Sequence, residues 1–345
     1  MAPTLKGGGG RCVFQMGKGG SMKPLNKGMI LMAGAILGLL AETAAAQPTD
    51  PSGPMTREKF QEYIRFFNAG DTHQFDYYTS DVVVETDNVH SRADLEAHDA
   101  GSRRSVAITF TPGLVAIDNM NNVMAVEMTV HTVALHDGIK LGNHPQPIHK
   151  GDAQTTKATF FYTLRDGKMA SLTIGRAGRT RQKADLAKAE AEAPTAAQLA
   201  EPMPASVNEP LMTRQKYMDY AKLFSRFDPR FLQYYDPDVV FATAPAPKPL
   251  HGPKAIYDLY VPIRKLLDEH LSVPMIVIDN PHGVMFVQLH NRMVATRGDV
   301  QLPSGVLNKG EELVGGGVIV YSLKNGKISY IRAAASGSSF EPAAK

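Results

Sequence analysis

Tryptophan is absent from this 345-residue sequence, and cysteine occurs once, at Cys12. The scarcity of cysteine excludes a disulfide framework, a thiol nucleophile and a cysteine-ligated metal site from the rest of the chain. The folded part must therefore be held together by hydrophobic cores alone, which domains of about 100–150 residues can supply.

A strong excess of charge is also lacking, since the net charge is +3. Residues 1–46 hold five Lys or Arg against one Glu, a net of +4, so the remainder carries about 3 − 4 = −1. Without a stripe of Lys and Arg the remainder cannot neutralise a phosphate backbone. No nucleic acid is therefore expected among its partners.

The N-terminal part has an apolar run, Met29–Leu40, of only 12 residues, whereas a membrane-spanning helix needs about 20. Basic residues at Met22–Lys27 precede it, and Ala44–Ala46 follows it. This layout predicts a secretory signal peptide that is cleaved near Ala46, behind an upstream extension over 1–21. We expect export to the periplasm or outside the cell, with no stable membrane insertion after cleavage; the alternative is an uncleaved anchor.

The rest of the chain repeats itself. Met55–Tyr63 returns as Met212–Tyr220, and Phe75–Val83 returns as Leu232–Val240, both 157 residues later. Such self-similarity predicts two copies of one domain. The expected divisions are 1–46 (removed), 55–180 (first copy), 181–211 (a linker rich in Ala, Glu and Pro), 212–335 (second copy) and 336–345 (a tail).

Within each copy a helical period gives way to a period of two. In the first copy we expect helices over 56–68, 74–78 and 91–103, then strands over 82–85, 106–110, 113–117, 123–136, 157–164 and 169–175. In the second copy the third helix is expected to run through Leu267. Asp166-Gly167 and Asn325-Gly326 predict the turns of the last hairpins, and Gly315–Gly317 predicts a bulge or a close backbone approach. The order predicts an α+β fold.

These features resemble the nuclear transport factor 2-like superfamily, and most closely its SnoaL-like members: polyketide cyclases, ketosteroid isomerase and scytalone dehydratase. The similarity is carried by Tyr63, by Asn68–Asp71, by the aromatic Tyr77–Val82 and by the closing Asp166–Lys168 hairpin. It covers about 55–178 and 212–335. It implies two tandem cone-shaped α+β barrels, each with three N-terminal helices closing a curved antiparallel sheet over an apolar pocket. It also implies an intramolecular pseudo-dimer, and leaves a homo-oligomer open.

The resemblance also implies site residues. Tyr63 occupies the place of the isomerase's oxyanion-hole tyrosine, and Tyr220 is its copy. The isomerase's general base falls at Thr86, so the adjacent Asp87 is a candidate base, with a turn role before Asn88 as the alternative. In the second copy the place is Thr243, with no acid nearby, and the isomerase's further acid falls near Phe160. A tyrosine hydroxyl in an apolar cone can stabilise a developing enolate. The alternative role of both tyrosines is core packing with locally satisfied hydroxyls.

Two matching histidines, His131 and His290, lie within expected strands. Either could be a general base tuned near neutral pH; the alternative is that both face the other copy. Further candidates for ligand binding, with surface, capping or ion-pairing roles as the alternative, are Tyr78, His90, Arg176, Tyr235, His251 and Arg332.

A metal site at His136, His144 and His149 is disfavoured, because their spacing matches no tight motif and the second copy has no histidine in the matching loop. We therefore expect no metal and no cofactor. The sequence predicts an exported tandem protein that binds a small, largely apolar molecule, aromatic or polyketide-like. As an enzyme it would catalyse isomerisation, dehydration, cyclisation or a related lyase step; the alternative is a non-catalytic binding or scaffolding protein of the cell envelope.

Overall fold

The structure, a computed structural model, describes residues 53–85, 88–139, 148–175, 178–243, 246–302 and 305–341. The expected signal segment and upstream extension lie outside these residues. Within the described ranges, none of the helices has the length and apolarity needed to traverse a bilayer.

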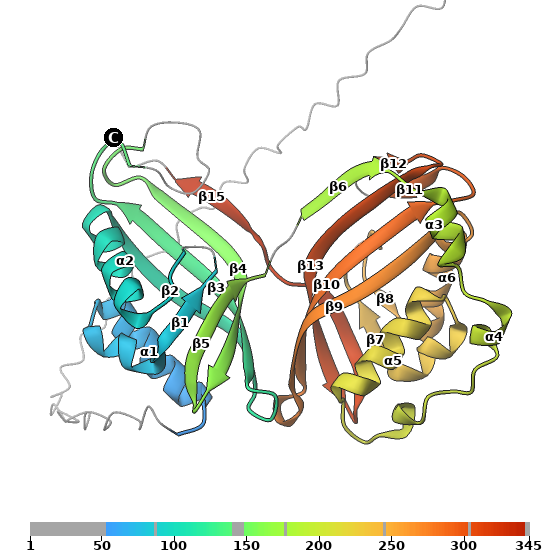
Figure 1. The fold of residues 1–345 in the computed structure, drawn as a ribbon, viewed down its shortest axis with the longest axis horizontal. Helices are drawn as coiled ribbons and strands as arrows, with labels where there is room; N and C mark the ends of the chain where they lie inside the picture. The colour runs from blue at the N-terminus through green and yellow to red at the C-terminus, as the bar shows by residue number, and fades with distance from the viewer. Residues whose placement is uncertain are drawn as a thin grey trace, which may run out of the picture. The chain divides into compact units, whose positions relative to one another are not determined.

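The first copy begins with helices and continues as a sheet (Figure 1). Its strands are ordered β1-β5-β4-β3-β2, with β1 parallel to β5 and the other neighbours antiparallel. Its elements are α1 (Arg57–Ala69), the 3₁₀ helix η1 (Thr72–Tyr77), β1 (Tyr78–Val84), α2 (Arg92–Ser105), β2 (Val106–Asp118), β3 (Val123–Ala134), β4 (Ala153–Arg165) and β5 (Lys168–Ile174).

The second copy repeats this arrangement, with strands ordered β8-β7-β14-β13-β10-β9 and β7 parallel to β14. Its elements are α5 (Arg214–Ser225), η3 (Pro229–Tyr234), β7 (Tyr235–Phe241), β8 (Leu250–His251), α6 (Pro253–Arg264), β9 (Leu267–Asp279), η4 (Asn280–His282), β10 (Val284–Ala295), the short hairpin β11 (Val300–Leu302) and β12 (Gly305–Leu307), β13 (Glu311–Lys324) and β14 (Lys327–Ala333). Between the copies lie α3 (Leu186–Ala191), α4 (Ala196–Leu199) and η2 (Ala205–Asn208).

Local sequence explains where these elements begin and end. The Thr56 hydroxyl accepts a hydrogen bond from the backbone of Lys59 and caps α1, and Thr213 caps α5 in the same way. The last hairpin of the first copy turns at Asp166 and Gly167, whose φ angles are 52° and 70°. Both angles are positive, as a type I′ turn requires, so the predicted turn is confirmed.

The α+β prediction is confirmed, with three corrections. Each sheet is mixed rather than antiparallel, because the first strand pairs in parallel with the last. The two strands expected over 106–110 and 113–117 are one strand, β2, interrupted by a bulge between Pro112 and Val115. The third helix of the second copy ends at Arg264, and β9 already begins at Leu267.

The strand that follows each copy pairs with the sheet of the other copy. β6 (Gly178–Lys183) adds to β13, and β15 (Gly337–Glu341) adds to β4. Gly178 and Gly337 are 159 residues apart, which is also the spacing of the paired residues Gly316 and Lys157. The exchange is therefore reciprocal, and residues expected to be linker and tail are edge strands.

The glycine run Gly315–Gly317 is explained by this exchange. A Cβ atom on Gly315 would lie 2.9 Å from the Arg179 Cα and inside contact distance of the Gly178 carbonyl. The expected close backbone approach is thus confirmed at Gly315. A Cβ atom on Gly317, by contrast, would meet nothing within 4 Å.

Three apolar clusters follow from the alternation of side chains along the strands. Met124, Val126 and Met128 of β3 face α1 in the first core. The second core is built in the same way around α5. The opposite faces of the two sheets meet in a third cluster that includes Phe161 and Phe286. Sheet faces thus pack against each other between the copies.

Candidate functional site

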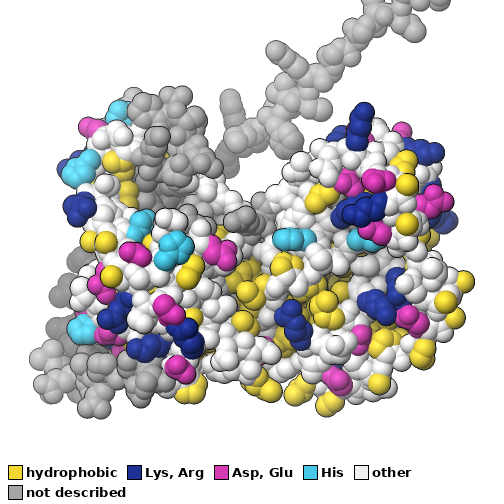
Figure 2. All heavy atoms as spheres, in the orientation of Figure 1, with side chains coloured by type: hydrophobic (Ala, Val, Ile, Leu, Met, Phe, Trp, Pro, Cys, Tyr) yellow, Lys and Arg dark blue, Asp and Glu magenta, His cyan; other side chains and the backbone are white. Residues whose placement is uncertain are grey.

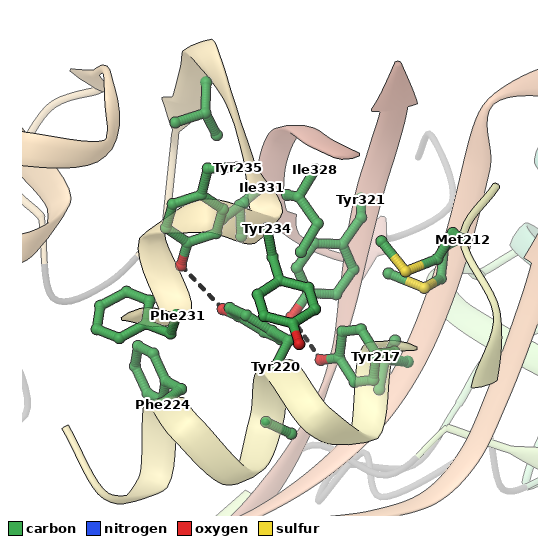
Figure 3. Packing of buried hydrophobic residues seen from close by; sticks show 14 of the residues in the cluster. Met212, Tyr217, Tyr220, Phe224, Phe231, Tyr234, Tyr235, Tyr321, Ile328 and Ile331 are labelled. Carbon is green, nitrogen blue, oxygen red and sulfur yellow. Dashed lines mark hydrogen bonds between the residues drawn. The ribbon is translucent and has the colours of Figure 1, made fainter. Parts of the chain in front are cut away.

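A pair of hydrogen-bonded tyrosines lies in each copy. Tyr63 Oη lies 2.6 Å from Tyr78 Oη, and Tyr220 Oη lies 2.9 Å from Tyr235 Oη (Figure 3). The first member lies on the helix and the second opens the first strand, so the repeat brings them together twice. Burial, followed by the neighbouring tyrosine, raises the pKa of both Tyr63 and Tyr220 well above the ordinary value. The pairs are therefore neutral, and in each the accepting hydroxyl keeps a proton to donate.

The copies differ around a third tyrosine. In the second copy Tyr217 Oη lies 2.8 Å from Tyr321 Oη (Figure 3). In the first copy Phe60 stands where Tyr217 stands, so the buried Tyr162 Oη has no hydrogen-bond partner among the described residues. The first core thus leaves one hydroxyl unsatisfied that the second core satisfies.

The second copy contains a cavity of about 260 Å³ inside its cone. Tyrosine rings line it together with apolar side chains from β10, β13 and β14, including Leu289 and Ile331. Both members of its tyrosine pair are in the wall. The tyrosines that line it are Tyr220, Tyr235, Tyr260 and Tyr321.

A buried carboxylate, Glu269 on β9, lies in the same wall and is 4% exposed. Asn291 Nδ2 donates to its Oε1 at 2.7 Å, and Arg264 Nη1 donates to its Oε2 at 3.3 Å. Strand pairing aligns Glu269 with Ile108 and Asn291 with Val130 in the first copy. Only the second copy therefore has this acidic group among the described residues.

Sequence reasoning missed Glu269. The predicted helix was extended through Leu267, so Glu269 fell at a boundary instead of on a strand. Burial, followed by the charge of Glu269, raises the pKa of Tyr260, and both residues line the cavity. The available signal was an acid that alternates with Leu267 and Leu271 and so shares a face with them in a strand.

Neither candidate histidine lies beside a tyrosine pair. His131 alternates with Glu127 on the face of β3 opposite the core residues Met124 and Met128, and its Nδ1 lies 3.1 Å from Thr155 Oγ1. His290 likewise shares a face of β10 with Phe286, in the cluster between the sheets. The structure therefore favours the alternative, in which both histidines lie on the sheet faces between the copies and away from the tyrosine pairs.

The histidines are not structural counterparts either. His131 pairs with Thr155, and the equivalent pair in the second sheet is Val314 with Arg292. The sequence match was therefore displaced by two residues. A shift of two preserves the face on which a side chain lies, so both histidines still point the same way.

The Arg332 guanidinium of the second copy forms an ion pair with Glu127 of the first copy. Its Nη1 and Nη2 donate to the two carboxylate oxygens of Glu127 at 2.6 and 2.7 Å. Arg332 lies outside the lining of the cavity, so the structure supports its alternative role as an ion-pair partner rather than a ligand contact.

The remaining candidates are spread apart. His90 is exposed and its Nε2 lies 3.2 Å from Asn88 Oδ1, and His251 is exposed on β8. Neither lines the cavity. Asp87 and Arg176 lie outside the described residues.

Neither a metal centre nor a polyanion surface is evident. No group of three His, Cys, Asp or Glu side chains could hold a metal ion in the described part of the chain, and His144 falls outside that part. On the face shown in Figure 2, Lys and Arg are interspersed with Asp and Glu. The cavity itself presents a carboxylate and tyrosine hydroxyls around an apolar space.

Among known proteins, similarity to this chain is found in solved structures. No family model matches the chain, and no curated protein matches it. Among solved structures it is similar to a putative polyketide cyclase from Pseudomonas putida KT2440 (22% identity over 35% of this chain and 91% of that one, TM-score 0.31). It is also similar to an epoxide hydrolase/cyclase-like enzyme of pyran ring formation in polyether salinomycin (20% identity over 34% of this chain and 86% of that one, TM-score 0.28). A third similar structure is the Delta 5-3-ketosteroid isomerase from Mycobacterium sp. (19% identity over 33% of this chain and 87% of that one, TM-score 0.26).

Each similarity spans about a third of this chain, which is the length of one copy. The order of helices and strands expected for each copy is confirmed by the structure itself, whereas membership of the nuclear transport factor 2-like superfamily stays an expectation from the sequence. At these identities and TM-scores the similarities assign no activity to the chain.

Proposed function

We propose that the second copy binds a small, largely apolar molecule and acts on it by cofactor-free acid–base chemistry. One observation carries the proposal: a buried carboxylate, Glu269, and a neutral tyrosine pair, Tyr220 and Tyr235, line the same cavity. Isomerisation, dehydration, cyclisation and lyase reactions all use a base and a hydrogen-bond donor in this way.

The chemistry follows from the positions of these groups. Glu269 takes a proton from a carbon next to a carbonyl group of the bound molecule. The tyrosine pair donates a hydrogen bond to the carbonyl oxygen as it becomes an enolate, and the low dielectric of the cavity strengthens that bond. Return of the proton to a different atom completes an isomerisation. Asn291 and Arg264 orient the carboxylate throughout.

A non-catalytic binding protein is the second candidate, and one observation favours it. Both oxygens of Glu269 already accept hydrogen bonds from protein groups, one of them from Arg264. A carboxylate held in this way can act purely as the buried partner of the guanidinium, whose pKa burial lowers. Under this alternative the cavity would retain its ligand unchanged.

Export belongs to the proposal as well. It rests on the basic, apolar and small-residue segments before Gln47. Expression of the full chain followed by N-terminal sequencing tests it. A new terminus near Gln47 supports export, and an intact N-terminus in the cytoplasm contradicts it.

Mass spectrometry of small molecules retained by the purified full chain tests the function. We expect an apolar ligand whose amount falls in Tyr220→Phe but not in Tyr63→Phe, the matched change in the first copy. Incubation of the recovered ligand in deuterated buffer then separates the two candidates. Wild type should catalyse exchange or conversion that Glu269→Gln does not, while binding persists. Equal behaviour of wild type and Glu269→Gln would leave only the binding role, and a ligand unaffected by Tyr220→Phe would contradict the site.

A further inference from the structure

The cavity of the second copy is not closed by the second copy alone. Its wall includes Thr159, Gly175 and Arg179, all of which precede the second copy in the sequence. The reason lies at the edge of β13, where β14 pairs from Ile319 onwards and the exchanged strand β6 pairs up to Gly316. Gly317 lies between the two partners and has open space at its Cβ position. The strand pairing of β13 is interrupted at this point, and residues that precede the second copy line the cavity.

Thr159 is the first sign that a ligand extends to this point. It is a polar residue that is 2% exposed, and its Oγ1 has no hydrogen-bond partner among the described residues. It pairs with Glu127 and alternates with Phe161, so its side chain lies on the face of the first sheet that meets the second copy. A buried hydroxyl left unpaired is costly, and a ligand group in the cavity would satisfy it.

Arg179 is the second and independent sign. It is the one cationic side chain in the described lining of the cavity, and no carboxylate within the described ranges pairs with it. Arg181, two residues along the same strand, lies within 4.0 Å of Glu311. The position equivalent to Arg179 in the other exchanged strand is Ser338. The unpaired guanidinium is therefore specific to the second cavity.

We propose that the molecule bound in the second copy carries a carboxylate, which Arg179 binds at the junction between the copies. The inference rests on the proposed function and adds the ligand class: an apolar, largely aromatic body with an acidic group at one end. The body lies against Tyr220 and Tyr235, and the carboxylate passes Gly317 to meet Arg179 and the Thr159 hydroxyl. A guanidinium matches the two oxygens of a carboxylate in one plane, which suits it to this role. The site is thus composite, and the first copy supplies its specificity.

Isothermal titration calorimetry of the full chain with two matched probes tests this inference. 2-Naphthoate and 2-naphthamide share one aromatic body and differ mainly in charge. We expect naphthoate to bind about fivefold to tenfold more tightly, a modest ratio because Arg179 is exposed. Arg179→Gln should abolish the preference, and Arg181→Gln, the matched control on the same strand, should retain it. Added salt should reduce the preference in wild type.

The outcomes separate this inference from the proposed function. If both probes bind equally to wild type, or if Arg181→Gln loses the preference as Arg179→Gln does, the carboxylate assignment is overturned while the cavity stands. If Gly317→Val leaves binding of both probes unchanged, binding lies elsewhere and both proposals fall. If neither probe binds at millimolar concentration, both proposals fall as well.

Discussion

Valine substitutions at two positions of one glycine run, Gly315 and Gly317, test the strand exchange and the cavity independently. Gly315 and Gly317 lie on the same face of β13, two residues apart. Side-chain space is taken at Gly315 by the backbone of β6 and is open at Gly317. Gly317→Val should therefore stabilise the protein or leave its stability unchanged, whereas Gly315→Val should destabilise it.

The magnitudes follow from the structure. Gly317→Val places three carbon atoms in the cavity, each buried CH₂ being worth about 0.8 kcal/mol. It also removes the roughly 0.5–1 kcal/mol that glycine costs in a strand. Because the new side chain stays partly exposed to the cavity, we expect the free energy of unfolding to rise by about 1–2 kcal/mol. Gly315→Val forces Gly178 and Arg179 away, and overpacking of this kind costs about 1–3 kcal/mol.

Urea unfolding and calorimetry with 2-naphthoate measure both effects. We expect Gly317→Val to be as stable as wild type or more stable, and to bind the probe at least about tenfold more weakly. Gly315→Val should unfold at lower urea. A destabilised Gly317→Val that still binds normally would refute the assignment of Gly317 to the cavity wall. A stable Gly315→Val would refute the close approach of the exchanged strand.

Two further predictions concern the third tyrosine of each copy and the ion pair between the copies. Tyr162→Phe removes an unpaired buried hydroxyl and should raise the free energy of unfolding by about 1 kcal/mol. Tyr321→Phe leaves Tyr217 unpaired and should lower it by about 1–3 kcal/mol. Urea unfolding measures both, and equal effects would contradict the assigned hydrogen bonds. Glu127→Gln should lower stability at pH 7 by about 2 kcal/mol. Although burial opposes it, hydrogen bonding from Arg332 holds the pKa of Glu127 below its ordinary value. This contribution is present above the ordinary pKa of a glutamate and is lost as the pH falls through the lowered pKa, so the stabilities of wild type and Glu127→Gln should converge as the pH is lowered further; a difference that stays constant with pH would refute the ion pair.

The repeat made much of the fold predictable. Aromatic residues at helical spacing placed Tyr63 and Tyr220 on the first helix of each copy. Tyr78 was expected at the end of a second helix and instead opens β1, so the hydroxyl pairs were not predicted. The resemblance implied an apolar pocket in each copy, but the cavity of the second copy could not be singled out, because that depends on how far the side chains of each copy fill its interior. Glu269 was missed for a local reason, since the end of α6 was placed three residues too far along the chain.

The strand exchange carries almost no sequence signal. Every residue of β6 is exposed, and Gly178–Lys183 has no alternation of apolar side chains. Backbone pairing with the edge of β13 and polar contacts such as Gln182 with Glu312 hold it in place, and neither leaves a periodic pattern in the sequence. The faces of His131 and His290 could not be assigned for a related reason: alternation predicts two faces, and only the packing between the copies shows which of them lies against the tyrosines.

A crystal structure of the full chain soaked with 2-naphthoate tests the central claim most directly. The account predicts one ligand in the second copy, with its rings beside Tyr220 and Tyr235 and its carboxylate directed to Arg179. A ligand found only in the first copy or on the outer surface, or an empty second cavity at saturating probe, would contradict it.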